Sequence, residues 1–489
     1  MDKRLTKRFA DEVVEEFVVP ALEGQRGLFY AIQLINKAHT VMLVDEGIIA
    51  REDGAKILSA LSEMDKEGEN LKLDPYLHEI YTNIEQQVIE RIGEDTGGKM
   101  HTGRSRNDLY SCSYRIVVRD KLLKIMMEVN KVRESLVNQA GKYYDTVMPG
   151  FTHTQSAQPT TLGHYFLAVG DSMKEDFDRI KDVYRRTNLN PLGAAAFAGT
   201  GFPVNRSRTA ELLGFDGIVE NSLKAVGDYS YMVEALSSLT ILMANLSRFM
   251  GDLITWSTSA FGMIELDDSF TCSSSIMPQK KNPFTAETIR SSIGELTGDL
   301  IQSLTIIKGL PTGFNYDLLC LADRCLIGFG AVHSCLRVLN GMIPTLIIHE
   351  DAMRRRATDG LSTATELADM LVREKGLSFK TAHGVVATAV RIALEQGKDT
   401  ITQEMINEAA EKRTGQVIEL EGGKLSVSIS QILRTRKSVG GASPVEVQRM
   451  TRSRQAKLGK ESIWIKQELD KIENSKVKLD SAIKSVRGG

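Results

Sequence analysis

The stretch YSYMVEALSSLTILMANLSRFMGDLITWST, residues 229–258, decides the fold of this chain. Its apolar side chains recur at steps of three and four residues, which places them on one wide face of an α-helix. The members of this face are Tyr231, Met232, Leu236, Leu239, Leu242, Met243, Leu246, Met250 and Leu253. A helix of roughly 25 to 30 residues spans roughly 40 Å. Because so wide a face needs several neighbouring helices, the stretch predicts a long helix inside a bundle.

The rest of the chain repeats this pattern. Residues 285–308 and 318–347 have the same apolar spacing, and few segments alternate as β-strands do. Proline is scarce, and the ranges without it are 112–148, 204–277 and 345–443. We therefore predict an all-α fold with a central long-helix bundle. Subunit association is expected to cover the apolar surface that remains, giving a helical core shared by several copies.

Composition excludes several classes of protein. The chain has 489 residues, with 61 Lys+Arg against 63 Asp+Glu, so its formal net charge is -2. This balance argues against a nucleic-acid binder and against a polybasic membrane-surface protein. The longest apolar stretch, residues 239–256, is interrupted by Arg248 and Asp252, so we expect no membrane span.

The cysteines and histidines also limit the possibilities. The five cysteines include no CxxC pair, and no signal-peptide core opens the sequence, so we expect reduced thiols in a cytoplasmic protein. The eight histidines lack metal-ligand spacing, so no metal site is expected.

Three polar or small-residue breaks suggest domain borders, at residues 93–108, 191–203 and 350–361. We predict three domains: an N-terminal helical domain at 1–110, a central long-helix bundle domain at 111–350 and a C-terminal helical domain at 351–489. The lysine-rich segment 471–489 is interpreted as a frayed, solvated end.

Polar loops held by rigid helices are where functional sites usually lie. Four stretches have this character: GGKMHTGRSRND at 97–108, PGFTHTQSAQP at 149–159, residues 191–206, and ELDDSFTCSSSIMPQKKNP at 265–283. Residues 93–99 match the first part of a phosphate-binding loop, but Met100 stands where Ser or Thr is required and no strand precedes it. The glycines at 199 and 201 lack the third glycine of a dinucleotide-binding pattern, so we expect a turn there.

The serine-rich loop at 265–283 has two interpretations. It is either a flexible connector or a binding loop for an anionic substrate. In the second case Lys280 supplies positive charge, while Asn282 and the serines donate hydrogen bonds. The cluster Ser105, Arg106 and Asn107 is likewise either a solvated turn or a second group of donors, with Arg106 able to bind a carboxylate through two N–H groups.

His153 lies between Thr152 and Thr154, before a proline at 159 that we expect to open a helix. Its imidazole titrates near neutral pH, which suits an acid or base catalyst, although an isolated histidine is more often structural. His101 and His164 are comparable by residue type, and composition alone does not rank the three.

The polar stretches together resemble a known superfamily. GKMHTGRSRND, FTHTQSAQPT and SSSIMPQKKNP look like the three signature regions of the fumarase/aspartase superfamily, in the expected order. HTGRSRND and MPQKKNP are typical of its argininosuccinate lyase branch. The same branch is indicated by PLGAAAFAGTGFPVNR, LSRFMGDLITWST, TATELADMLVREKGLSFKTAH and SVGGASPVEV. The resemblance extends over about residues 36–450.

The resemblance implies an all-helical, three-domain subunit that forms a homotetramer around a central helical bundle. Each active site would combine the three signature regions from three different subunits. It also implies a small-molecule substrate and neither a metal nor an organic cofactor.

The implied reaction is a β-elimination, in which the C–N bond of argininosuccinate breaks to give fumarate and arginine. By the resemblance, Ser274 is the base that removes the proton next to a carboxylate. Lys280 and Asn282 bind the carboxylate whose negative charge grows, which is where preorganised donors lower the barrier most. A serine is a weak base in water, so its surroundings must lower its pKa.

The other implied roles concern the leaving nitrogen and the carboxylates of the substrate. His153 would be the general acid or would orient the leaving nitrogen, and Glu287 would raise the basicity of His153. The residues implied to hold the carboxylates are Ser105, Arg106, Asn107 and Thr152.

Some positions depart from the family pattern where the arginine half of the substrate would bind. The departing residues are Ile35, Asn36, Tyr81, Tyr229, Phe314, Tyr316, Leu319 and Ala322. Because polar groups have become aromatic or aliphatic, each lost hydrogen bond is expected to cost about 1–3 kcal/mol. Three hypotheses stay open: an argininosuccinate lyase, a related lyase that releases fumarate from a different N-substituted aspartate, and a non-catalytic homo-oligomer of the same fold.

Overall fold

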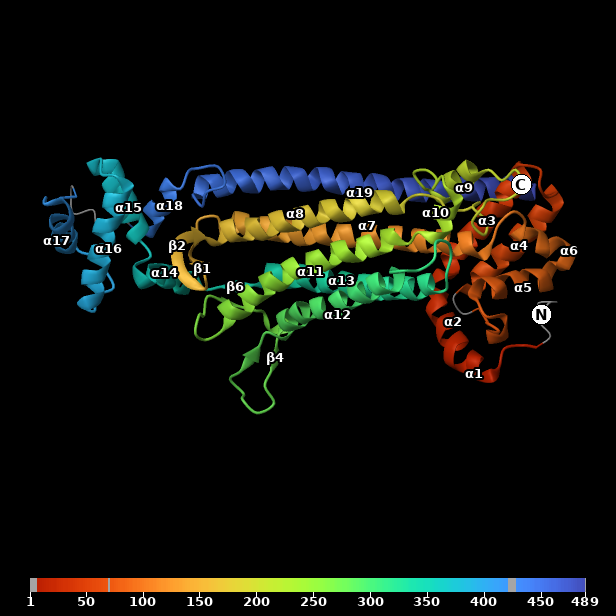
Figure 1. Cartoon of the computed structure of the whole chain (residues 1–489), viewed down its shortest axis with the longest axis horizontal. Coiled ribbons are helices and arrows are strands. Elements are labelled where there is room, and N and C mark those ends of the chain that lie inside the picture. The colour runs from red at the N-terminus through yellow and green to blue at the C-terminus, as the bar shows by residue number, and fades with distance from the viewer. Residues whose placement is uncertain (1–6, 69–70, 421–427, 489) are drawn as a thin grey trace.

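The computed structural model describes residues 7–68, 71–420 and 428–488. The molecule is elongated, with long helices side by side in the middle and smaller helical groups at both ends (Figure 1). The long helices are α7 (Arg106–Lys142), α8 (Leu162–Thr187), α11 (Ser230–Ser257), α12 (Phe284–Ile307), α13 (Asp317–Met342) and α19 (Pro444–Arg487). The predicted all-α fold is confirmed, and the helix predicted over 229–258 is α11.

α7 is the central helix of the bundle. It packs against α8, α13, α19 and the N-terminal helix α3 (Phe29–Asp45). Its side chains are buried on every side along most of its 37 residues, as expected for a helix surrounded by others. Its first turn is fixed by a capping box, in which Ser105 and Asp108 satisfy each other's backbone N–H groups.

The helices before α7 form one end of the molecule. They are α1 (Asp11–Val13), α2 (Val19–Gln25), α3, α4 (Arg51–Glu67), α5 (Ile80–Ile92) and α6 (Glu94–Gly97). Two short helices, α9 (Arg206–Leu213) and α10 (Ser222–Gly227), connect α8 to α11 near this end. One continuous apolar core joins the N-terminal helices to the bundle.

The opposite end carries the helices that follow α13. They are α14 (Glu350–Thr358), α15 (Ala364–Lys375), α16 (Phe379–Glu395), α17 (Gln403–Thr414) and α18 (Ile429–Thr435). α15, α16 and α17 bury a separate small core. The domain borders predicted at residues 110 and 350 stay predictions.

Short antiparallel strand pairs complete the fold. They are β1 (Val147–Thr152) with β2 (Gln155–Thr161), β3 (Ile264–Glu265) with β6 (Ile347–Ile348), and β4 (Cys272–Ser273) with β5 (Lys281–Asn282). Pro159 lies inside β2, opposite Pro149, and α8 begins only at Leu162. The expectation that Pro159 opens a helix is therefore wrong, because this segment pairs as a hairpin first.

The C-terminal segment is ordered along the bundle, which corrects the prediction of a frayed end for its described part. Helix α19 runs for 44 residues to Arg487 and packs against α7, α4 and α9. A stripe of buried apolar residues repeats every seven positions: Leu458, Ile465, Ile472, Leu479 and Val486. Since this spacing keeps the stripe on one side of a helix, the lysines between its members lie on the other sides.

One described segment, Asp317–Thr345, is long and apolar enough by composition to cross a membrane, and half of its most apolar stretch is buried inside the molecule. It contains α13, which packs against α12, α7 and α11. A bundle helix of this kind needs apolar residues on several sides.

Candidate active site

Ser105 lies at the N-terminus of α7, where it is the first of the predicted substrate-binding residues. Its hydroxyl oxygen accepts the backbone N–H of Asn107 at 3.3 Å, while Arg106 and Asn107 form the first turn. The Asn107 amide donates to the carbonyl of Ala196 at 3.1 Å. The N-terminus of a long helix favours negative charge, so this turn is suited to a carboxylate.

Asp108 anchors this turn to the loop at 191–203. One carboxylate oxygen accepts the N–H of Ser105 at 3.0 Å, and the other accepts the N–H groups of Gly193 and Ala195, both at 2.9 Å. The side chain is fully buried. Burial raises the pKa of Asp108 to about 6, although its hydrogen bonds act in the opposite direction. Asp108 is not among the residues predicted from sequence, although the capping-box spacing from Ser105 to Asp108 indicates it.

A buried polar cluster lies beneath the Ser105 turn. Arg104 donates to Asn36 Oδ1 at 2.7 Å and to the hydroxyl of Tyr81 at 3.3 Å. The Tyr81 hydroxyl also lies 2.6 Å from His101 Nδ1. His39 Nε2 contacts the carbonyl of Thr102 at 2.9 Å. Two departures from the family pattern, Asn36 and Tyr81, are therefore buried and hydrogen-bonded to Arg104.

Burial decides the charge of the two histidines in this cluster. It lowers the pKa of His101 to about 4 and the pKa of His39 well below its ordinary value, and the nearby Arg104 acts in the same direction. Both imidazoles are therefore neutral at pH 7. Arg106 reaches out of the cluster to Glu79 at 3.3 Å, with its own side chain about half exposed.

His153 lies at the tip of the β1–β2 hairpin. It and Thr154 both adopt positive φ angles, 52° and 59°, which make the tight turn between the strands. Thr152, His153 and Thr154 are all exposed. His164 differs, because its ring nitrogens contact Thr160 Oγ1 at 3.1 Å and the carbonyl of Gly440 at 2.9 Å. Of these two histidines, His153 is the one available to a ligand or a second subunit.

Ser274 lies in the loop between β4 and β5, which projects away from the bundle (Figure 1). Its hydroxyl oxygen accepts the backbone N–H of Met277 at 3.0 Å and that of Ile276 at 3.3 Å. The Asn282 amide donates to the sulfur of Cys272 at 3.8 Å across the strand pair. Two N–H groups directed at one hydroxyl oxygen stabilise negative charge on that oxygen.

A cavity of about 790 Å³ lies at the base of this loop and brings three predicted residues together. Lys280, Asn282 and Glu287 all line it, with Glu287 in the first turn of α12. Lys281 binds Glu265 and Asp268, at 2.7 Å each, and so ties the loop to β3. His349, which also lines the cavity, was missed because nothing in its sequence surroundings marks it.

A single chain does not assemble the whole predicted site. Ser105 begins α7, and the His153 hairpin follows the end of α7. A helix of 37 residues spans roughly 55 Å. Among the described residues, no hydrogen bond or ion pair joins Ser105, His153, Ser274 and Glu287 to one another. The Ser105 turn and the His153 hairpin therefore lie at opposite ends of α7 on one subunit.

The departing residues around the start of α13, together with Tyr229 just before α11, differ in accessibility. Leu319, Ala322 and Tyr229 are buried in the bundle, whereas Phe314 is half-buried and Tyr316 is 49 % exposed. Phe314 and Tyr316 are therefore the members of this set that remain accessible to a ligand. Across the described ranges, no group of three or more His, Cys, Asp or Glu side chains is placed to hold a metal ion.

Comparison with known proteins decides the family. A family model described as lyase matches residues 4–298, and a second, described as argininosuccinate lyase C-terminal, matches residues 361–439. The argininosuccinate lyase of Methanosarcina mazei is 43 % identical over 443 residues, which are 90 % of this chain and 89 % of that protein. This chain belongs to the argininosuccinate lyase family. The family member from Methanocaldococcus jannaschii is 40 % identical over 93 % of this chain and 94 % of its own length.

Solved structures of other lyases share the fold of this chain. EDDS lyase in complex with formate is 34 % identical, with a TM-score of 0.88 over 99 % of this chain and 97 % of that one. A variant of EDDS lyase with bound fumarate has a TM-score of 0.87. The class II fumarase of Schistosoma mansoni, at 16 % identity and a TM-score of 0.68 over 84 % of this chain and 94 % of that chain, shares the fold.

Proposed function

We propose that this protein is a carbon–nitrogen lyase that cleaves argininosuccinate into fumarate and arginine, and so acts in arginine biosynthesis. The observation that carries this proposal is the nearly full-length match to curated argininosuccinate lyases. The polar loops that hold Ser274, Lys280, His153 and Ser105 supply the residue types that the elimination needs. The test is release of fumarate from argininosuccinate by the purified protein, followed by ultraviolet absorbance.

The first step removes a proton from the carbon next to a carboxylate of the succinyl half. Ser274 takes this proton as its alkoxide, and the Met277 and Ile276 N–H groups support that form because they already point at the hydroxyl oxygen. The electrons of the broken C–H bond move onto the carboxylate. Lys280 and Asn282, on the same loop, stabilise this doubly negative group.

The second step forms the carbon–carbon double bond of fumarate as the C–N bond breaks. His153, as an imidazolium, donates a proton to the leaving nitrogen. The imidazole is then neutral, and arginine leaves with a protonated guanidinium group. Glu287 orients His153 and raises its basicity from another subunit, since no hydrogen bond joins the two within the described part of one chain. The Ser105 turn, with Arg106, Asn107 and Thr152, holds the carboxylates.

We infer that four copies of the chain assemble with shared active sites. α12 supports this inference, because only Ala286, Ile289, Leu296 and Ser303 are buried among its 24 residues. Large apolar side chains stay exposed on α12 and on its neighbour α13: Ile301 at 59 %, Leu304 at 48 %, Ile327 at 60 % and Val338 at 40 %. Apolar surface of this extent marks an interface. Light scattering of the purified protein tests the tetramer.

A related lyase with another leaving amine is the second candidate. The observation in its favour is the exposed aromatic residue Tyr316, with Phe314 beside it, where the family pattern has polar groups. The similarity to EDDS lyase, a lyase named for a different substrate, also favours this candidate. Turnover of other N-succinyl amines without turnover of argininosuccinate would decide for this candidate.

A non-catalytic oligomer is the third possibility. The joint presence of Ser274, His153, Lys280, Asn282 and Glu287 counts against it, because a structural protein has no use for all five. We also propose a cytoplasmic location, which the five free cysteines of the described chain support.

A further inference from the structure

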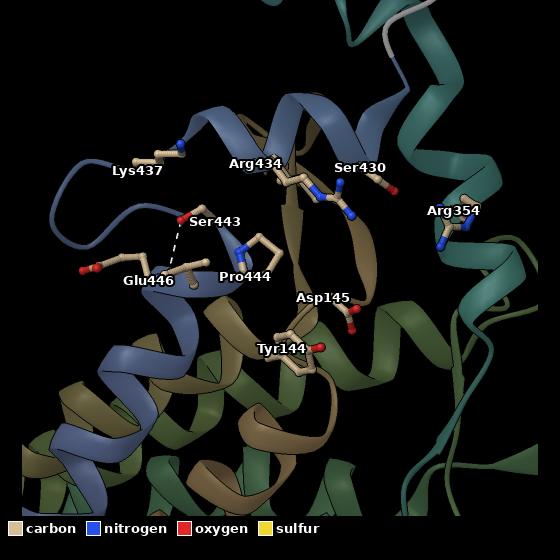
Figure 2. Close-up of a pocket in the computed structure, with 11 residues that line it drawn as sticks. Tyr144, Asp145, Arg354, Ser430, Arg434, Lys437, Ser443, Pro444 and Glu446 are labelled. Atoms are coloured by element: carbon tan, nitrogen blue, oxygen red, sulfur yellow. Dashed lines mark hydrogen bonds between the residues drawn. The ribbon is translucent and has the colours of Figure 1, made fainter.

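A second cavity, of about 670 Å³, lies where the C-terminal helices meet the bundle. Tyr144 and Asp145 line it just before β1, Arg354 comes from α14, and Arg434 comes from α18 (Figure 2). The start of α19 closes the cavity near Pro444. Three regions distant in sequence, at residues 144–145, 354 and 430–446, therefore converge on one hollow. It shares no lining residue with the cavity that Lys280, Asn282 and Glu287 line.

Three cationic side chains line this cavity without an acidic partner. Among the described residues, Arg354, Arg434 and Lys437 have no carboxylate within ion-pair distance. Their neighbours differ, because Arg436 binds Glu366 and Asp369 on α15. The three side chains are exposed and place positive charge around the cavity, which attracts an anion.

Two carboxylates line the same cavity, and neither neutralises the cations. Glu446 is held by Arg449 and by the N–H of Gly440 at 2.8 Å, and its carboxylate points away from the cavity in Figure 2. Asp145 also lines the cavity, and within the described part of the chain it forms no ion pair. The three cations therefore outnumber the one lining carboxylate that has no partner of its own.

The size and the apolar wall of the cavity indicate what kind of anion it suits. Its volume is within the range of small-molecule sites and exceeds the size of a bare inorganic ion. Leu433, Pro444 and the ring of Tyr144 provide an apolar side. Guanidinium groups bind phosphate through paired N–H donors, and an ammonium group adds a point charge.

We propose that this cavity binds a small organic phosphate. The phosphate is held by Arg434, Arg354 and Lys437, and the organic part lies against Leu433 and Pro444. The ligand would join α14 and α18 to the start of α19, and so connect the C-terminal helices to the bundle. The segment SVGGASPVEV, residues 438–447, forms one side of this site and has no role in the proposed elimination.

The test is calorimetric titration of the full-length protein with glucose 6-phosphate, phosphoenolpyruvate and AMP. Saturable binding of at least one probe in the millimolar range or tighter is expected, and glucose alone should not bind. Arg434→Gln and Lys437→Gln should each weaken binding about tenfold, the effect of losing one charge-assisted hydrogen bond. Arg434→Lys should weaken it less, because the charge remains.

Lys460→Gln is the matched control, since Lys460 is an exposed lysine on α19, whose start borders the cavity, and it does not line the cavity. It should bind the probe as the wild type does. Absence of saturable binding for all three probes would overturn the proposal. Equal affinity in the wild type, Arg434→Gln and Lys437→Gln would also overturn it, because the bound phosphate would then lie elsewhere.

Discussion

The carboxylate of Asp108 accepts the backbone N–H of Ser105 at 3.0 Å while its other oxygen binds the loop at 193–195. One buried side chain thus sets both the first turn of α7 and the loop beside it. The hydrogen bonds favour the carboxylate form, yet burial outweighs them and raises the pKa of Asp108 to about 6. Asp108 is therefore a positioning residue for the Ser105 turn.

Replacement of Asp108 by asparagine is expected to lower the free energy of unfolding by about 1–3 kcal/mol, because the amide keeps one oxygen and at least one of the three backbone N–H groups loses its acceptor. The pH dependence gives a second readout. A folded-state pKa raised above the unfolded value adds stability that is complete below about pH 4 and is lost as the pH rises through about 6. Urea unfolding between pH 4 and 7 should show that the variant lacks this decline. An identical slope in both proteins would contradict the role of Asp108.

His101 should contribute a pH dependence of the opposite sign. Its pKa is lowered to about 4, so it adds stability that is present above about pH 6.5 and is lost as the pH falls through about 4. We expect His101→Gln to lose less stability than the wild type on acidification over this range. The measurement is urea unfolding of both proteins, and the difference between them isolates this group from Asp108. Equal acid sensitivity of the two proteins would show that folding does not lower the pKa of His101.

Ser274→Ala should lower turnover at least about a hundredfold, the scale of losing a proton-transfer group, while the oligomer stays intact. Ser275→Ala is the matched control, because its side chain is exposed next to Ser274 in the same loop. The control should keep nearly full turnover, measured as fumarate release. Wild-type turnover in Ser274→Ala would refute the assigned base.

Leu479 tests the packing of the C-terminal helix. It is 1 % exposed within the stripe of α19, so Leu479→Ala should cost about 2–5 kcal/mol in the free energy of unfolding. Val477, two residues away, is 57 % exposed, and Val477→Ala should change stability by less than about 0.5 kcal/mol. Equal effects in chemical denaturation would mean that this part of α19 does not pack on the bundle.

The sequence predicted the helices whose apolar spacing is continuous. The helix predicted over residues 229–258 corresponds to α11 within one residue at each end. An uninterrupted apolar face at this spacing is buried only if the whole segment is helical. Helix α19 was missed at 471–489, where lysines conceal a seven-residue repeat. The hairpin at Pro159 was also missed, because its short strands leave little periodic signal.

The sequence predicted which residues of the candidate site lie on polar loops. It did not predict how these residues are arranged in space. Lys280, Asn282 and Glu287 share one cavity, as a loop followed by a helix start allows. The distance between Ser105 and Ser274 in an active site cannot be predicted from the sequence of one chain, since it depends on how copies of the chain pack together. Asp108 escaped notice because its importance comes from burial, which the capping pattern alone does not reveal.

The most direct test mixes two inactive variants, His153→Asn and Ser274→Ala, by dissociating and reassembling them together. If each active site takes His153 and Ser274 from different subunits, random assembly leaves about a quarter of the sites with both original residues. Fumarate release should then return to about a quarter of the wild-type rate, while each variant alone stays inactive. No recovery in mixed assemblies of proven composition would contradict the shared site.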